Sequence, residues 1–347
     1  MKKCLSIALS AVMAMALLAG CGNSDNASSD NASAGAGTTT ESAQNTDGKV
    51  LNIGIIQYMQ HASLDEAYQG FVDGLAEAGY VDGENITLNY QNASGEVGNC
   101  QSICDTFANG GSDLVLAIAT PAAQSAVNKF QDTDTPVLFT AVTDAVEAKL
   151  VDSNEAPGRE VTGTLDMPVI ADQIAVIKEV LPDAKTLGII YTSSEANSEI
   201  QAKEAEAAAK DLGMDVVIAT SSSTNDIPQV ISSIVNSNVD ALYIPSDNAM
   251  ASAMATINSQ AVENQLPVFC AVEVMIQEGG IATTAINYYD LGKQTAAMAV
   301  RIFNGEKASE IPVETQKDMG LVVNKTFAES VGVTIPEDML SKAVTVY

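Results

Sequence analysis

The chain carries three sequence landmarks twice, and this duplication constrains its fold more than any other feature. Each landmark lies in or beside a short apolar run, and each returns after about 130 residues. The pairs are Gly54 and Gly188, Asp113 and Asp240, and Pro136 and Pro267. Solenoid repeats have periods of about 20 to 50 residues, so this spacing predicts two similar lobes rather than a repeat array.

Short apolar runs alternate with helical segments in both halves. The expected strands span residues 50–58, 86–90, 114–119 and 136–141 in the first half, and 186–191, 239–245 and 266–272 in the second. The runs are rich in β-branched residues and bounded by turn residues, as strands are. Strands that alternate with helices form βαβ units, which give parallel sheets covered on both faces. The expected fold class is therefore α/β, with two similar doubly wound parallel-sheet lobes.

Two helix starts are recognisable from their capping residues. The segment Ser63-Leu64-Asp65-Glu66 has the form of a capping box, and it predicts a helix that runs to Gly79. Thr120 followed by Pro121 predicts a second helix, with the Thr as its N-cap and the Pro at its first helical position.

Composition limits the possible partners. The 347 residues include 44 acidic and 16 basic side chains, for a net charge of −28. Nucleic acids and anionic lipid surfaces bind basic patches, whereas the basic residues here are scattered, so neither is expected as a main partner. One His and scattered Cys leave little material for a zinc site, and no metal is predicted. Cys100, Cys104 and Cys270 are expected to be small buried hydrophobic residues.

The N-terminus has the pattern of an export signal. Lys2 and Lys3 precede an apolar stretch that is too short to span a bilayer comfortably. The sequence Leu-Ala-Gly-Cys that ends at Cys21 resembles the bacterial lipoprotein box, so residues 1–20 are expected to be removed and Cys21 to be lipidated. An ordinary signal peptide with a chance Cys is the alternative. Residues 21–48 are small and polar, and they predict a flexible tether.

A binding site is expected where the strands end. Ligands of open α/β sheets bind outside the carboxyl ends of the strands, and two facing lobes make a hinged cleft. Residues at these ends are rich in hydroxyls, amides and carboxylates and include no Lys or Arg. The candidate ligand contacts are Gln57, Ser94, Thr120, Pro121, Ala122, Thr143, Asp144, Asn197, Asp247, Asn248, Glu273 and Tyr288.

These side chains suit a zwitterion such as an amino acid. The helix N-terminus after Thr120 offers backbone N–H groups and a positive dipole end to a carboxylate. Asp144, Asp247 and Glu273 offer negative charge to an ammonium group. Flat apolar walls are available from Tyr58, Tyr191 and Tyr288. The alternatives are that Asp144 and Asp247 are turn or cap residues and that the tyrosines belong to the core.

Catalysis and cofactor binding have little support. The sequence has no G-x-S-x-G or H-E-x-x-H motif, and no G-x-G-x-x-G follows the first strand. His61 is the single histidine, and we expect it to be a loop residue beside the cleft. No catalytic residue and no cofactor is therefore predicted.

Several ordered motifs extend through both halves. They are residues 111–128 (GSDLVLAIATPAAQSAVN), 136–144 (PVLFTAVTD), 157–158 with 161–163, 194–198 (SEANS), 243–248 (YIPSDN) and 287–294 (NYYDLGKQ). In these motifs the chain resembles the substrate-binding lipoproteins of ABC importers that are often associated with tryptophan and tyrosine. The resemblance covers residues 50 to about 336. One departure is His61-Ala62-Ser63-Leu64-Asp65, where the family often shows His-Pro-Ala-Leu-Asp.

The resemblance implies a fold and a role. The fold is that of the type I periplasmic binding proteins, with lobe 1 at 50–163 and 285–316 and lobe 2 at 164–284 and 317–347. The role is to capture a small solute outside the cytoplasm and deliver it to a membrane permease with a cytosolic ATPase. Within the candidate list, the matching motifs single out Thr120–Ala122, Thr143, Asp144, Asn197, Asp247, Asn248 and Glu273. A sensor lipoprotein that signals to a membrane receptor is the alternative.

Overall fold

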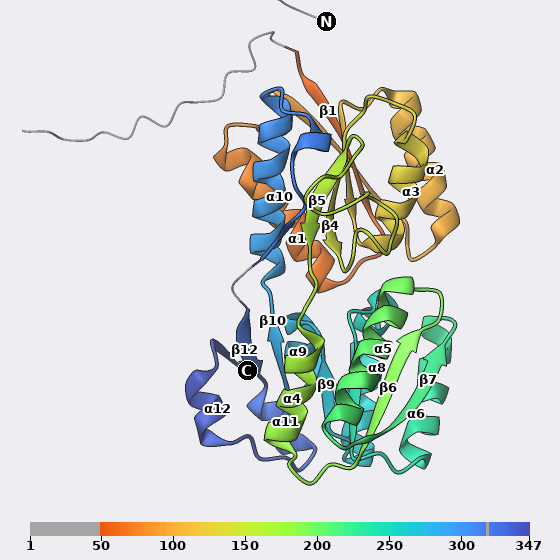
Figure 1. Cartoon of the computed structure of the whole chain (residues 1–347), viewed down its shortest axis with the longest axis vertical. Helices are drawn as coiled ribbons and strands as arrows, with labels where there is room; N and C mark the ends of the chain where they lie inside the picture. Colours follow the sequence, from red (N-terminus) through yellow and green to blue (C-terminus); the bar gives the residue numbers. More distant parts are fainter. Residues whose placement is uncertain (1–48, 317–318) are drawn as a thin grey trace, which may run out of the picture. The chain divides into compact units, whose positions relative to one another are not determined.

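The computed structural model describes residues 49–316 and 319–347 (Figure 1). The predicted signal peptide 1–20, the lipidation site Cys21 and the tether 21–48 lie outside the described residues. Within the described part, none of the helices combines the length and hydrophobicity needed to cross a membrane.

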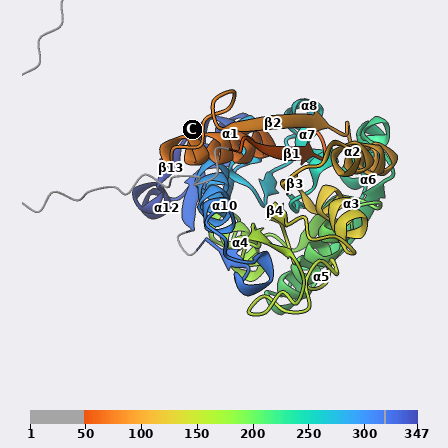
Figure 2. The same ribbon diagram turned by 90° about the horizontal axis from the view of Figure 1, so that it is seen from above.

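The first lobe is built on a parallel sheet of six strands. Their order across the sheet is β11 (Glu314–Thr315), β5 (Val161–Leu165), β4 (Val137–Val142), β3 (Leu114–Ile118), β1 (Leu51–Gln57) and β2 (Ile86–Asn92). The central strands β3 and β4 are buried along their whole length, as expected for a sheet covered on both faces. Helices α1 (Ala62–Glu77) and α10 (Tyr288–Phe303) cover one face, and α2 (Val97–Gly110) and α3 (Thr120–Phe130) cover the other (Figure 2).

The second lobe repeats this plan with a parallel sheet of four strands. The order is β7 (Asp215–Ser221), β6 (Thr186–Thr192), β8 (Ala241–Ile244) and β9 (Val268–Cys270). Its helices are α4 (Ile170–Val180), α5 (Ala196–Asp211), α6 (Ile227–Asn236), α7 (Asn248–Ser252), α8 (Met254–Asn264) and α9 (Glu273–Gly279). A small sheet of β10 (Ala282–Ala285), β12 (Gly320–Val323) and β13 (Thr345–Val346) follows β9, with α11 (Lys325–Ser330) and α12 (Glu337–Lys342) beside it.

The predicted duplication is visible in the hydrogen bonds. The Asp113 carboxylate accepts from the backbone N–H of Asn52, within β1, at 2.9 Å. Its counterpart Asp240 accepts from the N–H groups of Lys185 and Thr186 at 2.7 and 2.9 Å, next to β6. The same carboxylate therefore ties the first strand to the third strand in each lobe, and the strand orders β2-β1-β3-β4 and β7-β6-β8-β9 correspond.

Glycines bring α1 and α10 into close contact. A Cβ added to Gly70 would lie 1.9 Å from the carbonyl oxygen of Tyr289, and one added to Gly292 would lie 2.1 Å from the carbonyl oxygen of Ala67. Only residues without a side chain fit at these two positions. The packing fixes the start of α10 beside α1.

Two predicted helix starts need correction. Helix α1 begins at Ala62 after His61, no side chain caps it, and the Ser63 hydroxyl has no hydrogen-bond partner, so the capping box does not form. Helix α3 begins one residue earlier than predicted, because Ala119 turns the chain at φ = 82° directly after β3. Thr120 is therefore the first helical residue rather than the N-cap.

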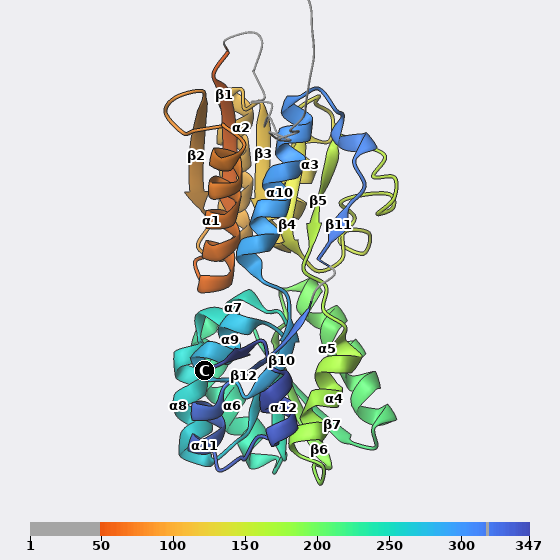
Figure 3. The ribbon, with the colours of Figure 1, turned by 90° about the vertical axis from the view of Figure 1, so that its left-hand side faces the viewer.

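Two of the connections between the lobes lie side by side (Figure 3). One runs from β5 to α4 and the other from β10 to α10. Strand β5 continues to Leu165 and β10 to Ala285, whereas the sequence places these crossings after Gly163 and Thr284. Of the third predicted crossing, residues 317–318 lie outside the described part.

Candidate functional site

A narrow cavity lies where strand ends of both lobes meet. Its free space is about 20 Å³, which holds one or two water molecules. The polar lining residues are His61, Ser63, Thr120, Thr143, Asp166, Asn197, Ser246, Asp247, Asn248 and Tyr288. The apolar lining residues are Leu64, Ala141, Ala251, Val272 and Met275. The lining therefore offers one polar and one apolar set of contacts and contains no Lys or Arg.

Hydrogen bonds cross between the lobes at this cavity. The Gln201 amide of α5 donates to the Thr143 hydroxyl, which follows β4, at 3.0 Å. The His61 Nε2 lies 3.1 Å from Asn248 Oδ1 at the start of α7. These bonds hold the walls of the cavity together.

The neighbours of His61 determine where its proton lies. Asn248 donates its amide group to the Glu195 carboxylate at 2.6 Å, so its Oδ1 faces His61 as an acceptor. Burial lowers the pKa of His61, which keeps the ring neutral near pH 7. The arrangement assigns the single ring proton to Nε2, so Nδ1 is an acceptor, and it has no partner.

Two acidic side chains of the second lobe are buried beside the cavity. Asp247 is the N-cap of α7 and accepts from the N–H groups of Met250 and Thr192 at 2.9 and 2.6 Å, and from the Thr192 hydroxyl at 2.9 Å. Glu195 accepts from the N–H groups of Asn248 and Ala249, both at 3.2 Å, besides the Asn248 amide. Burial raises the pKa of both carboxyls, and the charge of Asp247 raises that of Glu195 further.

A third buried carboxylate lies at the connections between the lobes. Asp166 follows β5, is 6% exposed and accepts from the Tyr288 hydroxyl at 2.6 Å through Oδ2. Its Oδ1 has no hydrogen-bond partner. Burial raises the pKa of Asp166, while the Tyr288 hydroxyl acts in the opposite direction.

The structure brings together half of the sequence-predicted contacts. The predicted residues that line the cavity are Thr120, Thr143, Asn197, Asp247, Asn248 and Tyr288. Thr120 opens α3, which no side chain caps, so the positive end of this helix lies at the cavity.

The other predicted contacts lie outside the lining. Pro121 and Ala122 are buried in the first turn of α3, and Ser94 is exposed. Gln57 is fully buried, and its amide donates to the Met59 carbonyl and to Asp65 at 2.9 and 2.7 Å.

Two of the three predicted ammonium ligands also point elsewhere. Asp144 accepts from the N–H groups of Val146 and Glu147, as a turn residue does. Glu273 begins α9, and its carboxylate accepts from the Tyr347 hydroxyl at 3.0 Å. Asp247 is the one of the three that lines the cavity.

Of the three tyrosines predicted as apolar walls, only one lines the cavity. Tyr58 is buried and donates to the Gly95 carbonyl at 2.7 Å, and neither it nor Tyr191 belongs to the lining. Tyr288 lines the cavity. The apolar contacts therefore come mainly from aliphatic side chains and methionine.

Four residues at or beside the cavity are absent from the candidate list. They are His61, Asp166, Glu195 and Ser246. Ser246 directly follows the expected strand 239–245, so the strand-end rule applied residue by residue finds it. Asp166 follows β5, which is not among the expected strands, so the rule does not reach it. The role of Glu195 depends on where α7 packs, which no local pattern reveals.

The three cysteines have the predicted character. Cys100, Cys104 and Cys270 are free and buried, and burial raises the pKa of the Cys100 thiol to about 11. Among the described residues, no group of three or more His, Cys, Asp and Glu side chains is placed to hold a metal ion.

Comparison with known proteins identifies the family. The model of the ABC transporter substrate binding protein family matches residues 52–347. A tyrosine-binding protein of Clostridioides difficile is 36% identical over 93% of this chain and 90% of its own length.

Two solved structures are similar to the chain as well. An ABC domain from Streptococcus pneumoniae in complex with L-Trp has 36% identity and a TM-score of 0.82, and the match covers 86% of this chain and all of that one. The ligand-free, open structure of a substrate-binding protein with adhesive properties from Clostridium difficile has 38% identity and a TM-score of 0.66, over 86% of this chain and 99% of that one. The chain therefore belongs to the ABC transporter substrate-binding proteins, a non-enzymatic family, and has the two-lobed α/β fold of the type I periplasmic binding proteins.

Proposed function

We propose that this substrate-binding protein captures a zwitterionic aromatic amino acid in the cavity between its lobes and delivers it to a membrane permease with a cytosolic ATPase. The observation that carries the proposal is the cavity lining, in which a helix N-terminus and buried carboxylates accompany an apolar set of side chains. The protein acts outside the cytoplasm and is held at the membrane by a lipid on Cys21.

The ligand class is supported by chemistry and by relatives. An amino acid carboxylate fits the uncapped N-terminus of α3 at Thr120, where backbone N–H groups and the helix dipole attract an anion. The lining holds no Lys or Arg to attract a phosphate group. Two relatives at 36% identity are described as tyrosine-binding and as a complex with L-Trp.

The side chain of the solute would lie against the apolar part of the lining. Leu64 of α1, Val272 before α9 and Met275 within α9 supply this part from both lobes. The thioether of Met275 packs well against aromatic rings, and the aliphatic side chains of Leu64 and Val272 contact a ring without burying a polar group.

Capture requires opening and closing of the lobes. The free space of about 20 Å³ admits water, so an amino acid enters only when the lobes separate or the lining side chains move. The two solved structures have similar sequence identity to the chain. The TM-score is nevertheless higher with the L-Trp complex, 0.82, than with the open ligand-free structure, 0.66. The bonds from Gln201 to Thr143 and from His61 to Asn248 would form as the lobes close.

The direct test is the identity of any solute that co-purifies. We expect mass spectrometry of the denatured protein to detect tyrosine or tryptophan at up to one molecule per chain. A stoichiometric solute that lacks an amino group, such as a sugar or a phosphate ester, would overturn the proposal.

A further inference from the structure

The three buried carboxylates around the cavity differ in the hydrogen bonds that they already make. Asp247 accepts three, from two backbone N–H groups and one hydroxyl. Glu195 also accepts three, all from the first residues of α7. Both carboxylates therefore serve to fix α7 against the strands and α5, and the protein itself supplies their hydrogen-bond donors.

Asp166 differs because half of its carboxylate is unused. The Tyr288 hydroxyl occupies Oδ2, while Oδ1 is buried on the cavity wall without a partner. A buried acceptor without a donor is unfavourable by about 1–3 kcal/mol, and more for a charged group. A bound group that carries an N–H donor would remove this cost.

We infer that Asp166 Oδ1 binds the ammonium group of the solute. This inference rests on the proposed function, and it assigns the positive end of the zwitterion to the connection between the lobes instead of to Asp144, Asp247 or Glu273. Thr120 at the start of α3 and Asp166 line the same cavity, so the solute would place its carboxylate at Thr120 and its ammonium at Asp166.

Two further acceptors support this assignment. Asn197 donates its amide to the Ser246 carbonyl at 2.9 Å, which leaves its Oδ1 on the cavity wall without a partner. His61 Nδ1 is likewise unpartnered in the same lining. The Ser63 and Ser246 hydroxyls of this lining are unpartnered as well. An ammonium carries three N–H donors, which the charged Asp166 Oδ1 and neutral acceptors on the same wall can accept.

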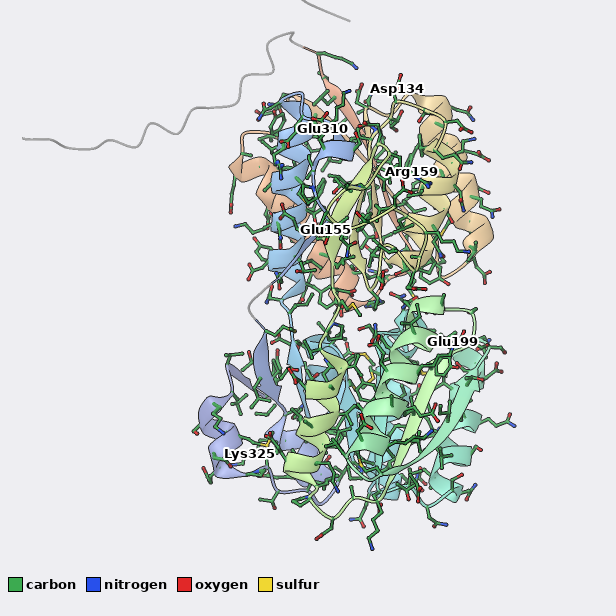
Figure 4. The ribbon with its side chains drawn as sticks, in the orientation of Figure 1. Asp134, Glu155, Arg159, Glu199, Glu310 and Lys325 are labelled. Carbon is green, nitrogen blue, oxygen red and sulfur yellow. The ribbon has the colours of Figure 1, made fainter. Side chains whose placement is uncertain are left out.

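The test compares two solutes on the wild type and two variants. Asp166→Asn keeps the shape of the side chain and an acceptor for Tyr288, but it removes the charge. Calorimetric titration uses L-tyrosine and its des-amino analogue 3-(4-hydroxyphenyl)propanoate, which lacks only the ammonium group. The matched control is Asp134→Asn, which removes the same charge from an exposed residue of the first lobe (Figure 4).

The expected result is selective. Asp166→Asn weakens the binding of L-tyrosine by about 30-fold or more, because a buried charge pair loses one partner. The same variant binds the des-amino analogue within about threefold of the wild-type affinity, which also shows that the site is folded. Asp134→Asn binds both solutes as the wild type does.

Each other outcome has a definite meaning. Equal losses for both solutes, or no loss for L-tyrosine, would overturn the assignment of Asp166 and leave the proposed function standing. A wild-type protein that binds none of the amino acids would overturn the proposed function, and the assignment with it.

Discussion

The Tyr288 hydroxyl donates to the Asp166 carboxylate at 2.6 Å and so joins two separate connections between the lobes. Asp166 lies where the chain leaves β5 for α4, and Tyr288 lies where it returns from β10 into α10. Both residues also line the cavity. A solute that binds here therefore contacts the segments whose backbone must rotate when the lobes close.

Removal of this hydroxyl is expected to destabilise the protein. Tyr288→Phe leaves Asp166 Oδ2 buried without its donor, so we expect the free energy of unfolding to fall by about 1–3 kcal/mol in urea denaturation. Tyr289→Phe is the control, because that hydroxyl bonds to Asp73 nearer the surface, and its removal should cost less than about 0.5 kcal/mol. Equal effects of the two substitutions would show that the contact between Tyr288 and Asp166 has no special role.

The buried carboxyl of Glu195 should make stability depend on pH. Burial, followed by the charge of Asp247, raises its pKa from 4.5 to about 8. Between these values the folded protein binds more protons at Glu195 than the unfolded chain does, so the free energy of unfolding falls as the pH rises.

Replacing Glu195 by glutamine isolates its contribution to the pH dependence of stability. We expect the difference in unfolding free energy between pH 5 and pH 8 to be smaller in Glu195→Gln than in the wild type by more than about 1 kcal/mol. Glu199→Gln, in the first turn of α5 and partly exposed, should leave that difference unchanged. Parallel pH profiles for wild type and Glu195→Gln would contradict the prediction.

The close approach of α1 and α10 predicts a steric effect. Gly70→Ala places a methyl group 1.9 Å from the Tyr289 carbonyl oxygen, so the helices must separate, and we expect a loss of about 2 kcal/mol or more in the free energy of unfolding. Gly98→Ala in α2 is the matched control, because nothing lies within 4 Å of the added Cβ. Because Ala has a higher helix propensity than Gly, Gly98→Ala should leave the free energy of unfolding unchanged or raise it by up to about 1 kcal/mol. A tolerated Gly70→Ala would contradict the packing described for this helix pair.

The orientation of Glu273 predicts that it is not a ligand contact. Its carboxylate bonds to the Tyr347 hydroxyl and does not line the cavity, so Glu273→Gln should change the free energy of solute binding by less than about 0.5 kcal/mol in calorimetry. A loss of more than about 2 kcal/mol would instead place Glu273 against the ligand ammonium.

The lipid anchor is testable in cells. We expect Cys21→Ser to abolish the incorporation of labelled palmitate and to move the protein out of the membrane fraction, because acyl chains contribute about 0.8 kcal/mol per buried methylene. Cys4→Ser, within the predicted signal peptide, should retain both label and membrane association. Labelling of Cys21→Ser would refute lipidation at this residue.

Local patterns in the sequence predict the two α/β lobes and seven of their strands, but not β5, β7, β11 or the small sheet of β10, β12 and β13. The apolar runs around Gly54 and Gly188 form β1 and β6, since β-branched residues bounded by turns have few other stable arrangements. Asp113 and Asp240 are recognisable as a pair, and each accepts a hydrogen bond from a backbone N–H of the first strand of its lobe.

The site is predictable only in part. Strand ends locate Thr120, Asn197 and Asp247 because the position of a parallel strand's carboxyl end follows from local pattern. The bond between Asp166 and Tyr288 joins residues more than a hundred positions apart, and the bond from Tyr347 to Glu273 depends on where the chain's last residues pack. Such pairings are set by tertiary structure, so charge and strand-end position alone select Glu273 and leave Asp166 out of the candidate list.

Calorimetric titration of the purified protein with L-tyrosine and L-tryptophan tests the central claim most directly. The account predicts one molecule bound per chain, with a dissociation constant in the micromolar range or below for at least one of the two, and a negative heat-capacity change as the apolar lining closes on the ring. Absence of binding for both amino acids to a protein that is folded by circular dichroism would contradict it.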